Sequence, residues 1–191
     1  IQTEIDVLKK IGAKITIKKD EIHIVGNKRI KSTNDQAAQM IKKGKEKGII
    51  IADLQTKGRG QYGKKWISQK GNLFMTVFYK INKEKNLNFL TNYNCRLVKS
   101  ALRNFINKKI TIKPPNDLLI NNKKLCGILQ ETIFFKLNKL IIVGIGVNII
   151  KSPNVKGYKT TFLNDFTAKK INKMIVFKSI SKLFEKNIRF L

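Results

Sequence analysis

Residues 113–135 carry the clearest structural signal in the chain and read KPPNDLLINNKKLCGILQETIFF. Within them, Asn121-Asn122 lies between two apolar runs, at 117–120 and 125–135. Asparagine tolerates the positive φ angles of a two-residue hairpin turn, so the two runs are predicted to be antiparallel strands. Pro114-Pro115 has no backbone N–H groups, and a short strand before it should stop there.

The elements on either side of this hairpin are predicted from the spacing of apolar residues. Alternation over 13–25, around Lys18-Lys19-Asp20, predicts a second hairpin. Further strands are predicted at 48–53, 72–79, 110–113 and 140–149. Helices are predicted from 35 to 48 behind an N-cap at Ser32-Thr33-Asn34, from 87 to 106, and from 168 to 190. Because strands and helices do not alternate strictly, the pattern favours an α+β fold with a mixed sheet and flanking helices.

The composition of the 191 residues suits one soluble domain. Hydrophobic residues make up 42% of the chain, which allows a sizeable core. No run approaches the roughly 20 apolar residues of a membrane span, and the first residues do not resemble a signal peptide, so we expect a cytoplasmic protein with no membrane partner. Cys95 and Cys126 form no CxxC pair and are expected to be free thiols. With His23 as the single histidine, the sequence argues against a zinc site and a Ser-His-Asp triad.

The net charge of +28 admits two interpretations. A basic surface is typical of nucleic-acid-binding modules, which neutralise phosphates. However, 35 of the 40 basic residues are lysines spread along the whole chain, whereas readers of base edges favour arginine. We interpret the charge as background composition that steers anionic partners, and we expect no specific nucleic acid. A basic nucleic-acid-binding module stays open as an alternative of a different class.

Residues 55–71 form a long Gly- and Lys-rich stretch, in which 58–66 read GRGQYGKKW. Three glycines allow the backbone to curl so that successive N–H groups converge on an anion, and the basic side chains add positive charge. Trp66 could stack on a nucleobase. A solvated turn with a core tryptophan is the alternative interpretation, and the spacing is not that of a Walker A loop.

Three further patterns offer side chains for chemistry. The prolines before Asn116 and Asp117 should fix the backbone and present both polar groups rigidly, although an Asx-type turn explains them equally well. Lys124 enters a strand near Gly127, where it could meet a phosphate or carboxylate, or simply face solvent. Residues 144–148 read GIGVN, a weak GxG pattern that is also typical of a tightly packed strand.

Five motifs in this order resemble the catalytic domain of biotin–protein ligases. The family's S-T-N, Q-T-x-G-R-G-R-x-G-R-x-W, K-W-P-N-D, K-x-x-G-I-L-x-E and G-x-G-x-N patterns correspond to residues 32–34, 55–66, 113–117, 124–131 and 144–148. The resemblance covers about residues 30–165 and implies a biotin/lipoate ligase-type catalytic domain, related to class II synthetases, over 30–191. Residues 1–29, interpreted as a hairpin-like segment, match no part of the family pattern.

The resemblance implies an ATP-dependent enzyme that makes biotinyl-5′-AMP and transfers biotin to a specific lysine of a biotin carboxyl carrier protein, a subunit of acetyl-CoA carboxylase. It implies ATP together with Mg²⁺, and no metal site built from protein side chains alone. A lipoate or octanoate ligase on the same fold is the alternative enzyme, and the loop at 58–66 favours the biotin branch.

The resemblance also implies roles for individual residues. Arg59 and Lys124 would act on the reacting groups, Arg59 at the biotin carboxylate and α-phosphate, and Lys124 throughout adenylation. Biotin would be bound by Ser32, Thr33, Asn34, Gln55, Gly58, Arg59, Lys124, Gly127 and Ile128. ATP or the adenylate would be bound by Arg59, Gly60, Gln61, Trp66, Asn116, Asp117, Lys124 and Asn148.

The chain departs from the family pattern at three places, which keep a degenerate, inactive ligase open as a further alternative. Gln61 stands where the family has a second loop arginine, and Pro114 stands where it has a tryptophan. The chain ends at Leu191, so the small C-terminal β-barrel of the family is expected to be absent. Residues 1–29 are too few for the winged helix of repressor-type members.

Overall fold

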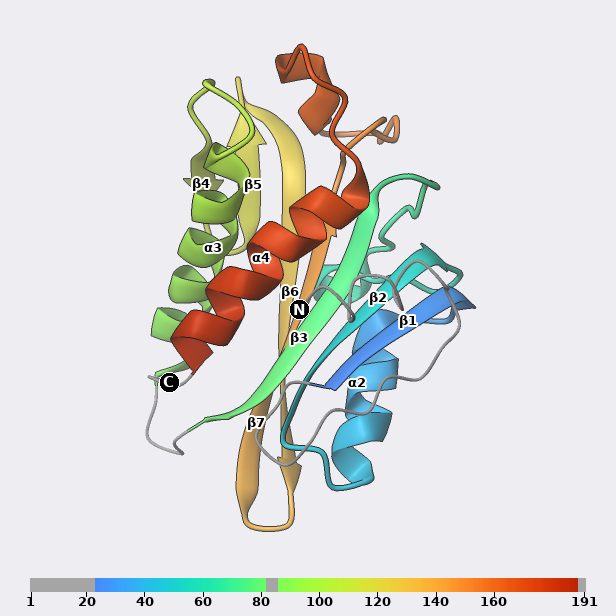
Figure 1. Cartoon of the computed structure of the whole chain (residues 1–191), viewed down its shortest axis with the longest axis vertical. Coiled ribbons are helices and arrows are strands. Elements are labelled where there is room, and N and C mark those ends of the chain that lie inside the picture. Colours follow the sequence, from blue (N-terminus) through green and yellow to red (C-terminus); the bar gives the residue numbers. More distant parts are fainter. Residues whose placement is uncertain (1–22, 82–85, 189–191) are drawn as a thin grey trace.

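The computed structural model describes residues 23–81 and 86–188, and these contain one seven-stranded sheet (Figure 1). Its strands are β1 (His23–Ile30), β2 (Lys47–Gln55), β3 (Leu73–Ile81), β4 (Thr111–Lys113), β5 (Asp117–Ile120), β6 (Lys123–Phe135) and β7 (Asn138–Val147). They lie in the order β1-β2-β3-β7-β6-β5-β4. β1 and β2 are parallel, and all other neighbours are antiparallel. The mixed sheet predicted from the sequence is therefore confirmed.

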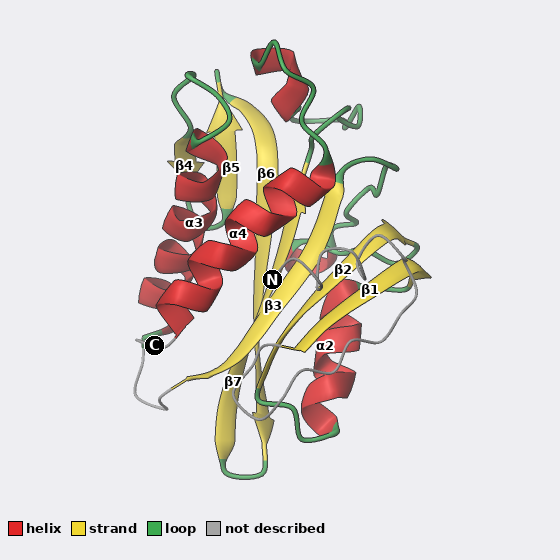
Figure 2. Ribbon diagram, in the orientation of Figure 1, coloured by secondary structure: helices red, strands yellow, loops and turns green. Residues whose placement is uncertain are grey.

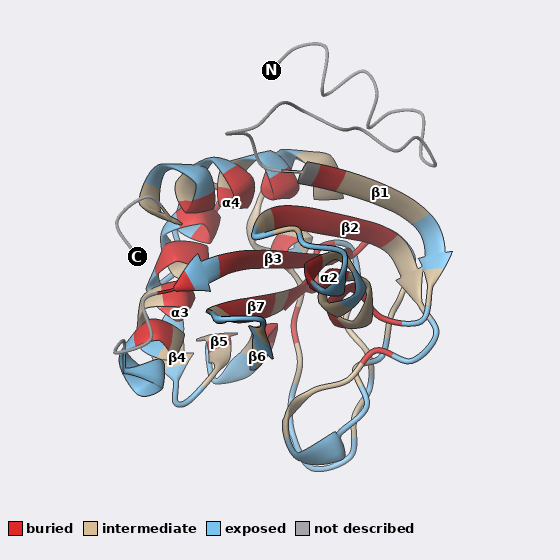
Figure 3. Cartoon of the chain, turned by 90° about the horizontal axis from the view of Figure 1, so that it is seen from below, coloured by how far each residue is buried: buried red, intermediate tan, exposed pale blue. Residues whose placement is uncertain are grey.

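Three α-helices in the described residues pack on the two faces of this sheet (Figure 2). They are α2 (Thr33–Lys42), α3 (Leu87–Arg103) and α4 (Lys173–Ile188). α3 and α4 join the larger buried cluster on one face, and α2 covers a smaller cluster on the other face (Figure 3). None of these helices is long and apolar enough to cross a membrane.

The burial of β2 explains why the predicted strand at 48–53 reads as a continuous apolar run. Side chains on a strand point alternately to opposite faces of the sheet. Ile49 and Ile51 therefore lie in the larger cluster, and Ile50 lies in the cluster under α2. Since helices cover both faces at this point, both sets of side chains are apolar.

The hairpin predicted at Asn121-Asn122 is confirmed. The two asparagines have φ angles of 48° and 59°, and the strands on either side pair antiparallel. β5 pairs with β4 on one side and with the first residues of β6 on the other, whereas β6 continues to Phe135 along β7. This register places Asp117 opposite Gly127, and Gly127 opposite Gly146, near the centre of the sheet.

The predicted bounds of α2 are partly wrong. The helix begins behind Ser32, as predicted, but the Ser32 side chain makes no capping hydrogen bond, and the helix ends at Lys42 instead of residue 48. Gly44 adopts a φ of 84°, which turns the chain out of the helix. The lysine-rich residues behind it contain no apolar side chain at helical spacing, so the chain continues directly into β2.

The elements predicted nearest the two ends of the chain are the helix from 168 and the hairpin at 13–25. α4 begins at Lys173 rather than 168, behind Asn172, whose side-chain oxygen accepts hydrogen bonds from two backbone N–H groups of the first turn. The predicted hairpin at 13–25 lies mostly outside the described residues. Its last residues belong to β1, which runs to Ile30 and pairs with β2.

Cys95 and Cys126 are buried free thiols, as predicted. Burial, with a smaller contribution from Asp117, raises the pKa of Cys95 to about 11. Complete burial raises the pKa of the Cys126 thiol well above its ordinary value. Both side chains therefore behave as small apolar groups of the core.

Candidate active site

A cavity of about 370 Å³ lies between the N-terminus of α2, the loop at 55–71, and strands β5 to β7. Nearly all residues predicted to bind biotin or ATP line this cavity. They are Ser32, Thr33, Asn34, Gln55, Arg59, Gly60, Gln61, Trp66, Asn116, Asp117, Lys124, Gly127 and Ile128. Segments that are far apart in the sequence are thus brought to one place by the topology of the sheet.

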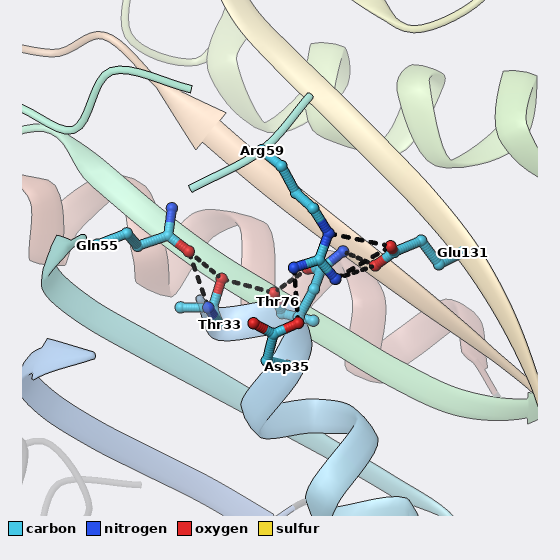
Figure 4. Close-up of polar contacts among 7 residues, drawn as sticks. Thr33, Asp35, Gln55, Arg59, Thr76 and Glu131 are labelled. Carbon is cyan, nitrogen blue, oxygen red and sulfur yellow. Dashed lines mark hydrogen bonds and ion pairs between the residues drawn. The ribbon is translucent and has the colours of Figure 1, made fainter. Parts of the chain in front are cut away.

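A polar network fixes the N-terminus of α2 at the cavity wall (Figure 4). Gln55 Oε1 accepts hydrogen bonds from the backbone N–H of Thr33 at 2.8 Å and from its hydroxyl at 3.0 Å. The Thr76 hydroxyl lies 2.8 Å from Thr33 Oγ1 and 2.6 Å from Asn34 Oδ1. Because Thr33, Asn34 and Thr76 are buried, these bonds hold α2, β2 and β3 in one arrangement.

Arg59 reaches from the loop toward the sheet and lies between two carboxylates (Figure 4). Nη1 donates to Asp35 Oδ1 at 2.6 Å, and Nη2 donates to Glu131 Oε1 at 3.1 Å. Asn34 Nδ2 donates to the other oxygen of Glu131 at 2.6 Å. Burial lowers the pKa of the Arg59 guanidinium, but its contacts with Asp35 and Glu131 outweigh this effect and raise the pKa, so Arg59 stays cationic.

The two glycines of the GxG pattern leave room for side chains that lie across β7. A β-carbon on Gly144 would overlap the side-chain amide of Asn34, and one on Gly146 would overlap the indole of Trp66. On the neighbouring strand, a β-carbon on Gly127 would lie 2.7 Å from Trp66 Cζ3. The pattern therefore marks a tightly packed strand, which was one of its two interpretations.

The indole of Trp66 lies on the facing pair Gly127 and Gly146. Its Nε1 is buried and has no hydrogen-bond partner among the residues that the structure describes. Buried donors of this kind are uncommon because an unmade hydrogen bond is costly.

Gly146→Ala is expected to displace the Trp66 indole, because the added methyl group needs the space that the ring occupies. Overpacking of this kind costs about 1–3 kcal/mol. Trp66 is the single tryptophan of the chain, so its fluorescence reports the change directly. We expect red-shifted emission and stronger quenching by acrylamide. Gly60→Ala is the control, since its β-carbon would meet nothing closer than 3.5 Å; identical spectra for both variants would contradict the packing described.

Lys124 lines the cavity and is not a surface lysine. Its Nζ lies 2.8 Å from Asp117 Oδ1, and the side chain is 19% exposed. The same Nζ lies 5.5 Å from the ring centroids of both Trp66 and Tyr158. The interpretation that Lys124 simply faces solvent is therefore wrong, whereas its neighbour Lys123 does face solvent.

Gly58 and Asn148, also predicted to bind ligands, do not line this cavity, although Asn148 lines a smaller pocket beside it. The Trp66 backbone N–H donates to Gly58 O at 2.9 Å, and a β-carbon on Gly58 would lie 3.0 Å from Trp66 O. Asn148 is 2% exposed, and its Nδ2 donates to Thr161 O at 3.0 Å. In this structure both residues support the cavity, and their ligand contacts stay predictions.

The charged groups at the cavity surface are mostly cationic. Its lining includes the side chains of Arg59, Lys64, Lys65, Lys113, Lys124 and Lys159, together with one carboxylate, Asp117. A concave surface of one sign concentrates ligands of the opposite sign. The arrangement therefore suits a ligand that carries phosphate or carboxylate groups.

Several residues of the site were not predicted from the sequence. Glu131 stands at the end of a recognised motif but was given no role, and its position beside Arg59 depends on the tertiary fold. Asp35 lies at the start of the helix predicted from residue 35, and Thr76 lies within the strand predicted at 72–79, so neither position marks a site residue in the sequence. Tyr158 lies in an irregular segment and carries no sequence signal that distinguishes it from a surface tyrosine.

Comparisons with protein families, with curated proteins and with solved structures all find proteins that this chain resembles. A model of the biotin/lipoate A/B protein ligase family matches residues 26–148. The bifunctional ligase/repressor BirA of Bacillus subtilis is 30% identical over 179 residues, which are 87% of this chain and 54% of BirA. A separate match spans only 34 residues, 18% of the chain, at 62% identity to the UDP-N-acetylglucosamine 1-carboxyvinyltransferase of Pelagibacter ubique, and this share is too small to describe the domain.

Among solved structures, the biotin protein ligase of Leishmania major in complex with biotinyl-5-AMP has a TM-score of 0.76 and 27% identity, over 91% of this chain and 76% of that one. The biotin protein ligase of Aquifex aeolicus in complex with biotin and ATP has a TM-score of 0.70 and 28% identity, over 90% of this chain and 71% of that one. The chain spans about half the length of the curated Bacillus relative, at 54%.

Proposed function

This chain belongs to the biotin/lipoate A/B protein ligase family, and we propose that it uses ATP to attach biotin to a lysine of an acceptor protein. The observation that carries the proposal is the convergence of two cations, Arg59 and Lys124, on one cavity with the aromatic rings of Trp66 and Tyr158. Such a cavity suits a ligand that combines an anionic phosphate with a flat base.

In the proposed first step, the biotin carboxylate attacks the α-phosphorus of ATP, the bond to pyrophosphate breaks, and biotinyl-5′-AMP forms. The step brings two anions together, so fixed cations must offset their repulsion and stabilise the charge that develops. Lys124 is held at the cavity by Asp117, at 2.8 Å, and needs little reorientation to act in this way. Arg59 reaches the same cavity from the loop at 55–71.

The residues at the cavity also fit a magnesium ion that enters with ATP. Asp117 offers a carboxylate and Asn116 an amide oxygen, and one or two such groups are enough for Mg²⁺, which keeps its other positions for phosphate and water. The described residues hold no cluster of three or more His, Cys, Asp or Glu side chains for an ion bound without ATP. When bound, the ion would stabilise the leaving pyrophosphate.

In the proposed second step, the acceptor lysine amine attacks the carbonyl carbon of the adenylate, an amide bond forms, and AMP leaves. We propose a biotin carboxyl carrier protein, as found in acetyl-CoA carboxylase, as the acceptor, and the cytoplasm as the place of the reaction. The net charge of +28 would speed the encounter with an acidic carrier. Residues 30–191 would form the catalytic unit.

Biotin-dependent exchange of pyrophosphate into ATP tests this proposal. Exchange that requires biotin supports it, and a folded protein without exchange would remove it. Lipoate is the second candidate substrate because the matching family includes lipoate ligases. Calorimetric titration with each acid separates the two substrates, since a protein that binds lipoate but not biotin would belong to the lipoate branch.

The loop at 55–71 is expected to close over bound ligands, as lids do when they exclude water from a reaction. Lys64 and Lys65 are exposed in the structure and are good sites for trypsin. Biotin and ATP together should slow cleavage at these two lysines. Cleavage at Lys136, in the exposed turn between β6 and β7, is the internal control. Two results would count against a lid. One is that ligands leave cleavage at Lys64 and Lys65 unchanged, and the other is that they protect Lys136 to the same degree.

A further inference from the structure

The two carboxylates that hold Arg59 are bound in different ways. Glu131 Oε1 accepts hydrogen bonds from Arg59 Nε at 3.4 Å and from Arg59 Nη2 at 3.1 Å, so Glu131 contacts the Nε–Nη2 side of the guanidinium. Its second oxygen also accepts the amide of Asn34, a buried residue fixed in turn by Thr76. Glu131 is therefore held from two directions.

Asp35 is held from one direction. Its carboxylate accepts a hydrogen bond from Arg59 Nη1 at 2.6 Å, and within residues 23–81 and 86–188 it has no other hydrogen-bond or ion-pair partner. The side chain is 43% exposed, so it can turn into water without leaving a buried charge behind. Figure 4 shows Asp35 and Glu131 on different sides of the guanidinium.

We propose that Asp35 occupies the place on Arg59 that an anionic group of the ligand takes, and that Glu131 keeps the guanidinium oriented before and after this exchange. The inference rests on the proposed function, in which Arg59 binds a carboxylate or a phosphate. Nη1 is the end of the guanidinium that Glu131 leaves free, and it is the end that Asp35 uses. Both acidic residues are positioning residues, because neither needs to touch the reacting atoms.

In this arrangement the two carboxylates have opposite effects on the function of Arg59. Asp35 competes with the ligand for Arg59, so it lowers affinity for anions. Glu131 restricts the guanidinium to one orientation, so it supports the rate of the reaction. Together, Asp35 and Glu131 also neutralise the partly buried charge of Arg59 while the cavity holds no anion.

The experiment compares Asp35→Asn, Asp35→Glu and Glu131→Gln with wild type in calorimetric titrations and in pyrophosphate exchange. Asp35→Asn should bind the anion about threefold to fivefold more tightly, because half-exposed ion pairs are weak competitors, and should lower KM accordingly. Asp35→Glu keeps the charge and should return toward wild type. Glu131→Gln should instead lower kcat, roughly tenfold, since it loses a charge-assisted contact to Arg59. Glu46→Gln removes a surface carboxylate on another part of the fold and controls for net charge.

Three titrants identify the source of the anion. Biotin carries a carboxylate, biotinamide carries none, and AMP carries a phosphate. Tighter binding of biotin or of AMP by Asp35→Asn, with biotinamide unchanged, supports the exchange and names the group that replaces Asp35. Equal gains with biotinamide, no gain with any titrant, or parallel losses in both variants overturn it. A wild-type protein that binds neither biotin nor AMP removes the proposed function itself, and the exchange with it.

Discussion

Replacing Lys124 with alanine is expected to slow biotin-dependent pyrophosphate exchange by roughly 10²- to 10³-fold, the usual effect of removing a preorganised donor from a developing charge. The ammonium group lies on the wall of the cavity, 2.8 Å from Asp117 Oδ1 and 5.5 Å from the ring centroids of Trp66 and Tyr158. Alanine would remove this cation and leave the Asp117 carboxylate without its partner. Both changes make the cavity less favourable for the anions that must meet there.

Two control variants separate this effect from general damage. Lys123→Ala removes an exposed lysine from the preceding position of the same strand and should leave exchange close to wild type. Lys124→Arg keeps the charge and should retain more activity than alanine. Thermal unfolding measured by circular dichroism checks that all three variants fold. Normal exchange by a folded Lys124→Ala protein would exclude Lys124 from the reaction.

The wild-type protein is expected to label its own lysines with biotin, and Gln61→Arg is expected to reduce this labelling about tenfold. Gln61 lines the cavity next to Arg59, at the position where the family pattern has an arginine. A charge-assisted hydrogen bond contributes roughly 1.5–3 kcal/mol, against about 1 kcal/mol for a neutral one. Since about 1.4 kcal/mol is a factor of ten, an adenylate held by Gln61 should escape about ten times faster. Released adenylate acylates nearby amines, and the chain offers 35 lysines.

Mass spectrometry of the labelled protein, with and without a carrier domain, measures this leak. Lysines near the cavity, such as Lys64, Lys65 and Lys159, should be labelled first. Gln61→Glu has the same size but adds negative charge, and it should increase labelling. If wild type labels only the carrier and Gln61→Arg changes nothing, then a neighbouring lysine such as Lys57, Lys64 or Lys65 supplies the charge that the family takes from arginine.

Local signals were sufficient to predict most strands of this fold. The hairpin at Asn121-Asn122 follows from two residues that accept positive φ, and the buried strand at 48–53 follows from an apolar run of the right length. The end of α2 could not be placed in this way. Gly44 and Gly48 are both plausible helix-ending glycines. The lysine-rich residues between them favour the earlier end, but the pairing of β2 from Lys47 onward, which requires that end, is not a local signal.

The site was predictable as a set of motifs but not as a geometry. Resemblance gave the lining residues that belong to short patterns, whereas Tyr158 and Lys159 also line the cavity and belong to none. The ion pairs of Arg59 with Asp35 and Glu131 join α2, a loop and β6, and no local pattern encodes such a contact. The glycines of β7 illustrate the same limit: their spacing was visible, but the side chains that lie over them, Asn34 and Trp66, come from other parts of the chain.

The rates at which the two buried cysteines are alkylated report how often the fold opens around each of them. Because burial raises the pKa of both thiols, little thiolate exists at neutral pH, and alkylating reagents must wait for the structure to open. Cys126 lies on β6, two residues from Lys124, whereas Cys95 lies on α3. A faster reaction at Cys126 would mean that the strand carrying the site opens separately, and equal rates would mean that strand and helix open together as one unit.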